Sequence, residues 1–379
     1  MSSQSLPKYL DIARAIESQI LGRDGAKVPS SRQVATAYGV SVVTASRAIQ
    51  VLKDKGLIRT VERSGSFLTP AAPAADAREC YALVQRSTPG PWFQASLSFS
   101  HAGFAAVARQ EGVRFEVDRF QFDEAARPAD FHRQARRAAE AGVSGVVFMP
   151  SRHQAEAAAQ DEAFLRSCRE AGLAIVLIER NLRGLARALE YDLVAADDFD
   201  GGLRCTHHLL DQGRRRVAFL TGSPTSSHEG RLAGYLTALL HAKTGWGPVV
   251  LEQPSGLASK KSYGELADRI LAHGADGVVC YQDYTALGLI LELLNRGIRV
   301  PSDVAITGFD NLPIGKAYSI GVTTYAFSAE AVARHATRLI RSRLSGCPGP
   351  PVKVLIPGEL IIRESSRPEP LPADASGAV

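Results

Sequence analysis

Charged and amide side chains follow several short apolar runs of this chain, at the positions where those runs end. Glu179, Gln282 and Asp310 each come directly after such a run. Apolar runs that alternate with helical stretches predict buried parallel strands joined by right-handed β-α-β units. Because ligands of parallel sheets bind beyond the carboxyl ends of the strands, we expect these side chains to meet in one cleft.

The residue types at these strand ends suit a polyhydroxylated ligand, and they favour a sugar over a purine. An aromatic face packs against a sugar ring, while carboxylate and guanidinium groups take pairs of hydroxyls through charge-assisted hydrogen bonds. Two candidates have structural alternatives, since Asp283 is also placed to cap the next helix and Trp92 to pack within a lobe. The candidate ligand contacts are Trp92, Phe93, Glu179, Asp197, Ser227, Arg231, Gln282, Asp283 and Asp310.

The apolar runs extend over more than two hundred residues, which is too many for one compact open sheet. They therefore predict an α/β body of two side-by-side lobes with parallel sheets. The runs are CYALV (80–84), VRFEV (113–117), VSGVVFM (143–149), AIVLI (174–178), RVAFL (216–220), GVVCY (277–281) and VAITGF (304–309).

The first seventy residues carry a different chemistry, because the net charge of +5 is concentrated there. They contain ten Lys and Arg against five Asp and Glu, whereas the remainder has 34 of each. A small basic unit on a neutral body is expected of a DNA-contacting module, although a solvated charged face gives the same count.

The pattern of this basic segment predicts helix, helix, helix, hairpin. Tyr9 and Ile12 begin an apolar stripe of helical period, which Ile16 and Ile20 continue. A capping turn at 27–31 precedes a short helix at about 31–38, which Gly39 ends. Ser41 can cap a third helix whose buried stripe is Ala45, Ala48, Ile49 and Leu52, and Gly56 stops it. β-branched and aromatic residues around Ser64-Gly65 then predict a hairpin over Leu57 to Thr69.

This element order is that of a winged helix-turn-helix, in which the third helix presents its polar N-terminal face to a major groove. Arg32, at the start of the second helix, can reach the phosphate backbone, and the hairpin with Arg59 would lie over the adjacent groove. Three-helix units without a DNA function are the alternative. The candidate DNA contacts are Ser30, Ser31, Arg32, Ser41, Thr44, Ser46, Arg47, Arg63, Ser64 and Gly65.

The stretch KVPSSRQVATAYGVSVVTASRAIQVLKDKGLI (27–58) resembles the GntR-type winged helix. The matching positions are Pro29, Ser30, Arg32, Val34, Ala35, Gly39, Val40, Ser41, Thr44, Gly56, Leu57 and Ile58. The resemblance implies DNA-contact roles for Arg32, Ser41, Thr44 and the wing residue Gly65. Val42 and Ser46 stand where arginine is frequent in that family, and Arg63 replaces the first wing glycine. The half-site sequence therefore cannot be transferred from relatives.

Most of residues 79–365 resembles the LacI/GalR effector domain, which has a periplasmic-binding-protein-like (type I) fold. The strings that carry this resemblance are RRVAFLTGS (215–223), GRLAGY (230–235), DYTALG (283–288), RVPSDVAITGFDN (299–311), VTT (322–324) and GELIIRES (358–365). It implies that Asp310, Arg231, Asp197, Glu179 and a Trp92-Phe93 loop lie at the effector cleft. Glu179 and Gln282 are one methylene longer than the Asp and Asn common there. The resemblance also implies a homodimer through the body and a chain that crosses between the lobes three times.

These patterns predict the domain boundaries. We expect a winged helix-turn-helix at 1–69 and a Pro/Ala-rich linker at 70–78. The effector domain follows at 79–365, and 366–379 is expected to be a disordered tail. The first lobe of the effector domain would comprise about 79–195 and 324–352, and the second lobe about 196–323 and 353–365. The whole resembles the arabinose-repressor architecture, in which the linker replaces the DNA-inserting hinge helix of LacI-type proteins.

The leading hypothesis is a transcriptional regulator, most simply a repressor, that binds a palindromic double-stranded operator as a homodimer. A sugar would close the clamp and release the DNA. The alternatives are a non-sugar effector such as a purine, dependence on a co-repressor, and a solute-binding protein. That last class needs a signal peptide and has no basic winged head.

Other functions are disfavoured by what the sequence lacks. No catalytic motif is present, and a fused PLP-dependent aminotransferase body would be longer and need a Schiff-base lysine. The five cysteines are far apart and His207-His208 fits a helix surface, so no metal site or cofactor is expected. There is no secretory signal and no apolar run of eighteen residues, which predicts a cytoplasmic protein without membrane contact.

Overall fold

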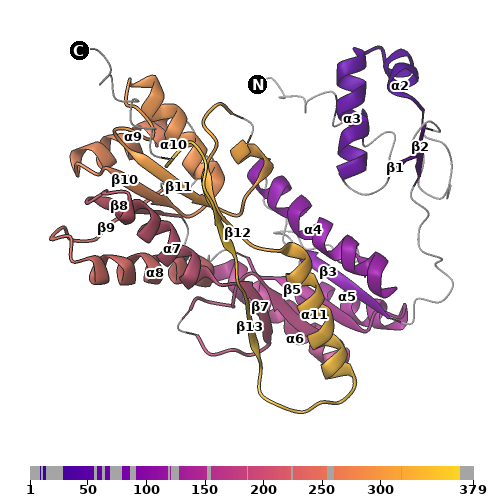
Figure 1. Cartoon of the computed structure of the whole chain (residues 1–379). Helices are drawn as coiled ribbons and strands as arrows, with labels where there is room; N and C mark the ends of the chain where they lie inside the picture. The colour runs from indigo at the N-terminus through magenta and orange to yellow at the C-terminus, as the bar shows by residue number, and fades with distance from the viewer. Residues whose placement is uncertain are drawn as a thin grey trace, which may run out of the picture. The chain divides into compact units, whose positions relative to one another are not determined.

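The structure is a computed structural model that divides into two compact units (Figure 1). The first unit is Met1–Glu79 with Ala105–Arg114, and the second is Cys80–Phe104 with Phe115–Val379. Within the described part of the chain, no helix is both long and apolar enough to cross a membrane. The residues described are 9, 12–13, 29–54, 58–61, 65–68, 79–85, 91–117, 120, 128–151, 155–185, 187–222, 225–253, 260–316 and 318–367.

The described part of the head has the predicted order helix, helix, hairpin, and most of the predicted first helix, with Ile16 and Ile20, lies outside the described residues. Helix α2 (Ser31–Tyr38) is followed by α3 (Val42–Asp54), and strands β1 (Ile58–Val61) and β2 (Gly65–Leu68) pair as an antiparallel hairpin. Gly39 ends α2 with a φ of 61°, in the left-handed region that favours glycine. The predicted stripe of α3 is buried together with residues of α2 and of the first helical segment. This core consists of Ile12, Ala13, Val34, Ala35, Ala45, Ala48, Ile49 and Leu52.

The first lobe of the body is built on a sheet whose strand order is β13-β7-β6-β5-β3-β4. Each pairing from β13 to β3 is parallel. The strands are β3 (Cys80–Gln85), β4 (Arg114–Glu116), β5 (Gly145–Met149), β6 (Ala174–Ile178), β7 (Asp192–Ala196) and β13 (Lys353–Ile356). The helices of this part of the chain are α4 (Pro91–Glu111), α5 (Pro128–Glu140), α6 (Ala155–Glu170) and α11 (Ala329–Leu344).

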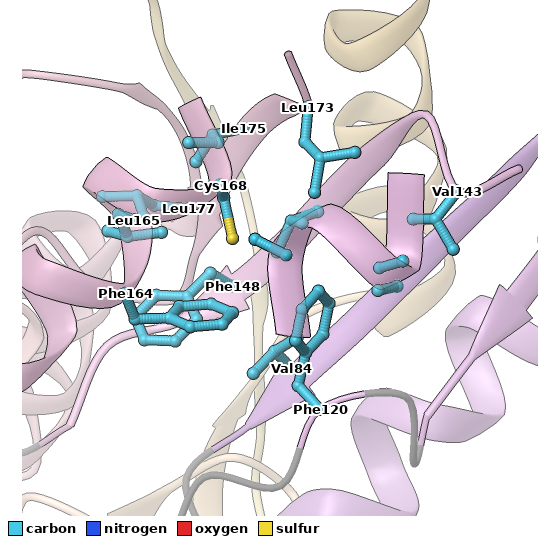
Figure 2. Packing of buried hydrophobic residues seen from close by; sticks show 14 of the residues in the cluster. Val84, Phe120, Val143, Phe148, Phe164, Leu165, Cys168, Leu173, Ile175 and Leu177 are labelled. Atoms are coloured by element: carbon cyan, nitrogen blue, oxygen red, sulfur yellow. The ribbon is translucent and has the colours of Figure 1, made fainter. Parts of the chain in front are cut away.

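The core of the first lobe lies between its sheet and helices α5 and α6. Figure 2 shows Phe148 of β5, Phe164 of α6 and Phe120 converging there. The ring centroids of Phe120 and Phe164 lie 5.0 Å apart with their planes nearly perpendicular, the edge-to-face geometry that aromatic pairs prefer. The fully buried Leu177 and Cys168 pack in the same cluster. This packing fixes the strands whose carboxyl ends carry the candidate ligand contacts.

The second lobe has a sheet of order β14-β12-β11-β10-β8-β9, in which only β14 pairs antiparallel among the described strands. Its strands are β8 (Val217–Thr221), β9 (Val249–Glu252), β10 (Gly277–Cys280), β11 (Ala305–Phe309), β12 (Thr323–Ala326) and β14 (Glu359–Ile361). The helices are α7 (Asp198–Asp211), α8 (Ser226–Ala242), α9 (Lys260–Ala272), α10 (Asp283–Asn295) and the short η1 (Pro313–Lys316). Two lobes with parallel sheets confirm the predicted fold class.

The described strands show the three crossings that the family resemblance implies, but two predicted lobe boundaries are wrong. The chain passes between the sheets after β7, after β12 and after β13. Strand β12 lies wholly in the second sheet, so the lobe changes after Ala326 and not at 324. Strand β13 belongs to the first sheet, not to the second lobe, because α11 packs on β5, β6 and β7 and returns the chain to that sheet.

The predicted tail also begins too early. Ser366 is fully buried, its hydroxyl donates to Thr323 Oγ1 at 2.6 Å, and His208 Nε2 lies 2.7 Å from the same hydroxyl. His208 is half-buried against Ser366 and is not simply a surface residue, and burial lowers its pKa. The linker at 70–78 and residues 368–379 lie outside the described residues.

Candidate functional site

Arg231 of α8 contacts residues at the ends of β10 and β11 of the second lobe and Asp198 at the start of α7. Its Nε donates to Asp198 Oδ1 at 2.8 Å, and its Nη2 donates to Asp310 Oδ1 at 3.2 Å. Nη1 donates to the carbonyl oxygen of Tyr281, and the guanidinium lies 3.6 Å from the centroid of the Phe309 ring. Of the predicted contacts, Arg231 and Asp310 are joined directly here, whereas Asp198 and Tyr281 are neighbours of the predicted Asp197 and Gln282.

Glycines in α7 and α8 allow this arrangement, because they let the two helices approach closely. A Cβ added to Gly202 would lie 2.0 Å from the carbonyl oxygen of Arg231, and one added to Gly234 would lie 2.2 Å from that of Phe199. Neither separation leaves room for a side chain. The glycines thus position Arg231 opposite Asp198 at the start of α7.

The charges around Arg231 are buried and strongly coupled. Burial raises the pKa of Asp198 to about 7, although the neighbouring guanidinium acts in the opposite direction. Burial by itself would lower the pKa of Arg231, but Asp310 and Asp198 outweigh it and hold the pKa above its ordinary value. One cation is therefore shared by two carboxylates, one of which belongs to the predicted contact Asp310.

Two of the predicted contacts have backbone conformations that non-glycine residues rarely adopt. Glu179 has a φ of 65° and Asp310 a φ of 89°. Glu179 accepts from Ser100 Oγ at 3.0 Å and from Arg180 Nη2 at 3.2 Å, so its carboxylate is held by groups of the first lobe. Strained backbone of this kind gathers at functional sites, and here it stands directly after β6 and β11.

Asp283 requires a correction, since the structure places it inside the second lobe and not at a ligand-facing surface. Its side chain is fully buried, and Oδ2 accepts from the backbone N–H of Leu312 at 2.7 Å. Burial raises its pKa to about 8. Asp283 therefore holds the loop that follows Asp310, which makes it a positioning residue. It does not cap α10 either, because it is the first residue of that helix.

Gln282 belongs to a polar cluster beside Tyr281. Its Nε2 donates to the Tyr281 hydroxyl at 3.2 Å and to Thr285 Oγ1 at 3.4 Å. Gln253 Oε1 accepts from that tyrosine hydroxyl at 2.8 Å and from Thr285 at 3.0 Å. The amide of Gln282 is thus oriented by Tyr281, which follows β10, and by Thr285 of α10, as a hydroxyl-binding group needs to be.

The remaining predicted contacts are placed differently. Ser227 is buried with its Oγ 2.9 Å from Thr225 Oγ1, and half-buried Asp197 caps α7 by accepting from Asp200 N at 3.0 Å. Trp92 and Phe93 lie in the first turn of α4, so the expected loop at this position is wrong. Their side chains lie outside the described part of the structure.

A cavity of about 160 Å³ lies beside this cluster. It is smaller than the roughly 300–1,000 Å³ of most small-molecule sites. Glu179 and Asp197 are the predicted contacts that line it, together with Asp198 and apolar side chains that include Leu185 and Phe199. The cavity therefore touches one side of the candidate site.

Sequence reasoning missed two residues of the site. Asp198 binds Arg231 directly, whereas the prediction selected its neighbour Asp197. The signal was the pair of carboxylates after β7, and the phase of α7 decides which of them faces inward. Phe309 supplies the aromatic face beneath the guanidinium, a cation–π contact. Its position at the end of the VAITGF run could have indicated this.

In the head, the predicted DNA contacts divide into capping residues and exposed residues. Ser30 forms a capping box with Gln33, in which Ser30 N donates to Gln33 Oε1 at 2.8 Å and Gln33 N donates to Ser30 Oγ at 3.4 Å. Ser41 Oγ accepts from Thr44 N at 3.2 Å and caps α3 as predicted.

The other predicted DNA contacts lie on the surface of the same helices or at the wing. Ser46 and Arg47 are exposed on α3, and Ser31 and Arg32 form the start of α2. Gly65 is the first residue of β2. Arg63 and Ser64 lie outside the described residues.

Metal-binding chemistry finds no support among the residues that the structure describes. They contain no group of three His, Cys, Asp or Glu side chains able to hold a metal ion. The cysteines are free, and burial raises the pKa of the Cys205 thiol to about 12.

Two family comparisons match separate parts of the chain. Residues 8–68 match the gntR family of bacterial regulatory proteins, and residues 206–366 match the periplasmic binding protein-like domain. The chain is a gntR-family head fused to a periplasmic binding protein-like domain.

Individual curated proteins also match the chain. The HTH-type transcriptional regulator GalR of Salmonella typhimurium is 31% identical over 194 residues, which are 50% of this chain and 55% of that protein. The chain thus aligns with little more than half the length of this relative. The arabinose metabolism transcriptional repressor of Geobacillus stearothermophilus is 24% identical over 340 residues, 86% of this chain and 87% of that protein.

Solved structures share the fold. The transcription regulator CcpA of Lactococcus lactis superposes with a TM-score of 0.60 at 21% identity, covering 76% of this chain and 99% of its own. A complex of the transcriptional regulator CelR with cellobiose has a TM-score of 0.59 at 21% identity, covering 89% of this chain and 100% of its own.

Proposed function

We propose that this protein is a transcriptional regulator whose affinity for an operator is controlled by a sugar bound between its two lobes. The observation that carries the proposal is the arrangement of Arg231 and Asp310 on a fold with a winged head. One guanidinium holds two carboxylates over an aromatic ring at the ends of parallel strands, which is the position where such folds bind ligands.

The geometry indicates how a sugar would be recognised. Asp310 and Glu179 stand on different lobes, and each carboxylate can accept from two neighbouring hydroxyls. The Gln282 amide adds a donor and an acceptor. A ligand that bridges the two carboxylates would bring the lobes together. Sugar binding to the body would then be coupled to DNA binding by the head. The coupling free energy is set by the difference between the affinities of the sugar for the open and the closed conformation of the body.

Relatives support both parts of the proposal. The arabinose metabolism transcriptional repressor matches over most of its length, and the CelR structure holds cellobiose. These names favour a sugar as the effector. We therefore propose a binding protein and not an enzyme. Because its proposed target is a chromosomal operator, we also propose that it acts in the cytoplasm.

We further propose that the protein acts as a homodimer through its body, on a palindromic operator. Leu271 of α9 and Leu291 and Leu294 of α10 are each more than one-third exposed, and these two helices pack against each other. They offer an apolar surface of the kind that mediates association. Light scattering of the protein and of a Leu291→Glu, Leu294→Glu variant tests this surface, since only the variant should be monomeric.

A thermal-shift screen of sugars and nucleobases against the purified protein tests the proposed effector class. A sugar that raises the melting temperature of the native protein, and not that of an Asp310→Asn variant, supports the proposal. Asp268→Asn is the matched control, because Asp268 also pairs with an arginine but is 71% exposed on α9. Stabilisation by nucleobases alone would overturn the assignment to sugars.

A further inference from the structure

Two apolar side chains are exposed in the first turn of α3. Val42 is 48% exposed and Val43 is 67% exposed, whereas Ala45 and Ala48 are fully buried. Val42 and Val43 are followed on the same exposed strip by Ser46 and Arg47, four residues further along. The strip therefore begins with valine methyl groups and continues with polar side chains.

The hydroxyl groups next to these valines are engaged in capping the helix. Ser41 Oγ lies 2.9 Å from Thr44 Oγ1 and also accepts from the backbone N–H of Thr44. The first turn of α3 contains no acidic residue. What this turn offers to a partner is thus largely the methyl surface of Val42 and Val43, within a head of net positive charge.

The major groove of DNA contains one apolar recognition element, the C5-methyl group of thymine. Valine is suited to contact it, because a β-branched side chain in a helix is almost restricted to one χ1 rotamer. Its methyl groups therefore hold a fixed position and lose little conformational freedom on binding. The positive charge of the head favours DNA over a neutral protein surface as the partner of this strip.

We propose that Val42 and Val43 determine operator specificity by packing against thymine methyl groups in the major groove. The proposal rests on the DNA-binding function proposed above and names the bases that the head reads. Arg47, on the same strip, would supply the adjacent polar contact to a guanine or a phosphate.

The test begins with selection of a preferred duplex from a random library by the full-length protein. The selected duplex is then resynthesised with deoxyuridine in place of each thymidine in turn, which removes only the C5-methyl group. At one or two positions in each half-site, the substitution should weaken binding of the duplex by the protein about 3- to 5-fold, as expected for the loss of one buried methyl group. In Val42→Ala and Val43→Ala variants, binding to the thymine duplex should fall similarly and the thymine–uracil difference should shrink.

Val250→Ala is the matched control, because Val250 is 41% exposed on β9, in the second lobe. It should retain the full thymine–uracil difference. If no thymine position is sensitive, or if the sensitivity persists in the double valine variant, the proposal is overturned while the DNA-binding function stands. A change of oligomeric state without a change in DNA affinity would also overturn it, in favour of a second copy as the partner. Failure to enrich any sequence would overturn both proposals.

Discussion

Arg231 Nη2 donates to Asp310 Oδ1 across 3.2 Å, joining α8 to the residue directly after β11. Asp310 has a left-handed backbone conformation directly after β11, and this conformation sets the direction of its carboxylate. The pair is only partly covered, since the Asp310 side chain is 24% exposed while that of Arg231 is 9% exposed. A ligand can therefore reach the carboxylate while the arginine holds it in place.

This relationship predicts the effect of changing Asp310. An Asp310→Asn variant should lose ligand affinity by at least 10-fold, because it keeps the shape but loses a charge-assisted acceptor for sugar hydroxyls. Its operator affinity without ligand should remain within about 2-fold of the native value. Calorimetry with the sugar from the screen and anisotropy with labelled operator measure the two quantities. Equal sugar affinity in both proteins would contradict the cleft assignment.

The raised pKa values of the buried Asp198 and Asp283 predict that the stability of the protein falls as the pH rises. Burial raises the pKa of Asp283 to about 8 from a usual value of 3.8, so the folded state holds this proton more tightly than the unfolded state. The free energy of unfolding should therefore decrease between about pH 4 and pH 8. Each such proton contributes a slope of about 1.4 kcal/mol per pH unit within that window.

An Asp283→Asn variant isolates this contribution. Its amide oxygen can still accept from Leu312 N–H, but it no longer titrates. Urea unfolding at pH 5.5 and pH 8 should show a smaller pH dependence than in the native protein, with Asp198 contributing the rest over the range up to about pH 7. An unchanged slope would mean that Asp283 ionises normally in the folded state.

The close approach of α7 and α8 predicts that Gly202→Ala is destabilising. The added Cβ would lie 2.0 Å from the backbone oxygen of Arg231, so the helices must separate. We expect a loss of about 1–3 kcal/mol together with weaker sugar binding. Gly247→Ala is the matched control, since no heavy atom lies within 4 Å of its added Cβ. Equal stability of the two variants by urea unfolding would be the opposing result.

The capping box predicts that Ser30 contributes to stability of the head whether or not it contacts DNA. Ser30→Ala should lower that stability by about 0.5–2 kcal/mol. Gln33→Ala should have a comparable effect, and the double variant should lose less than the sum, because each residue's cap bond depends on the other. Ser31→Ala, at the next position, serves as the control. Additive losses in thermal unfolding would show that the two residues act independently.

The described elements of the head could be predicted because local residues encode their boundaries. Ser30, Gly39 and Ser41 act on backbone groups within a few residues, and the structure has α2 and α3 where these residues place them. The strands of the body with long aliphatic runs, such as β6 and β10, were equally readable. Their burial on both faces produces the signal.

What remained hidden depends on tertiary structure. Strand β7 follows β6 without a helix between them, and β12 has the sequence TTYA, so neither presents an aliphatic run bounded by helices. The sheet to which β13 adds is decided by where α11 packs, which no local residue indicates. At the site, the burial of Asp283 and the inward orientation of Asp198 depend on helix phase. The residue types therefore indicated the chemistry of the site, whereas the tertiary structure determines which of these residues form it.

The most direct test of the central claim is titration of the active sugar into a complex of the full-length protein with labelled operator. Anisotropy should show at least a 10-fold rise in the dissociation constant in the native protein, within the usual range of allosteric coupling. Arg32→Ala, Thr44→Ala should abolish operator binding while leaving sugar affinity intact. Operator affinity that stays constant at saturating sugar would contradict the account, and tighter binding with sugar would show that the sugar acts as a co-repressor.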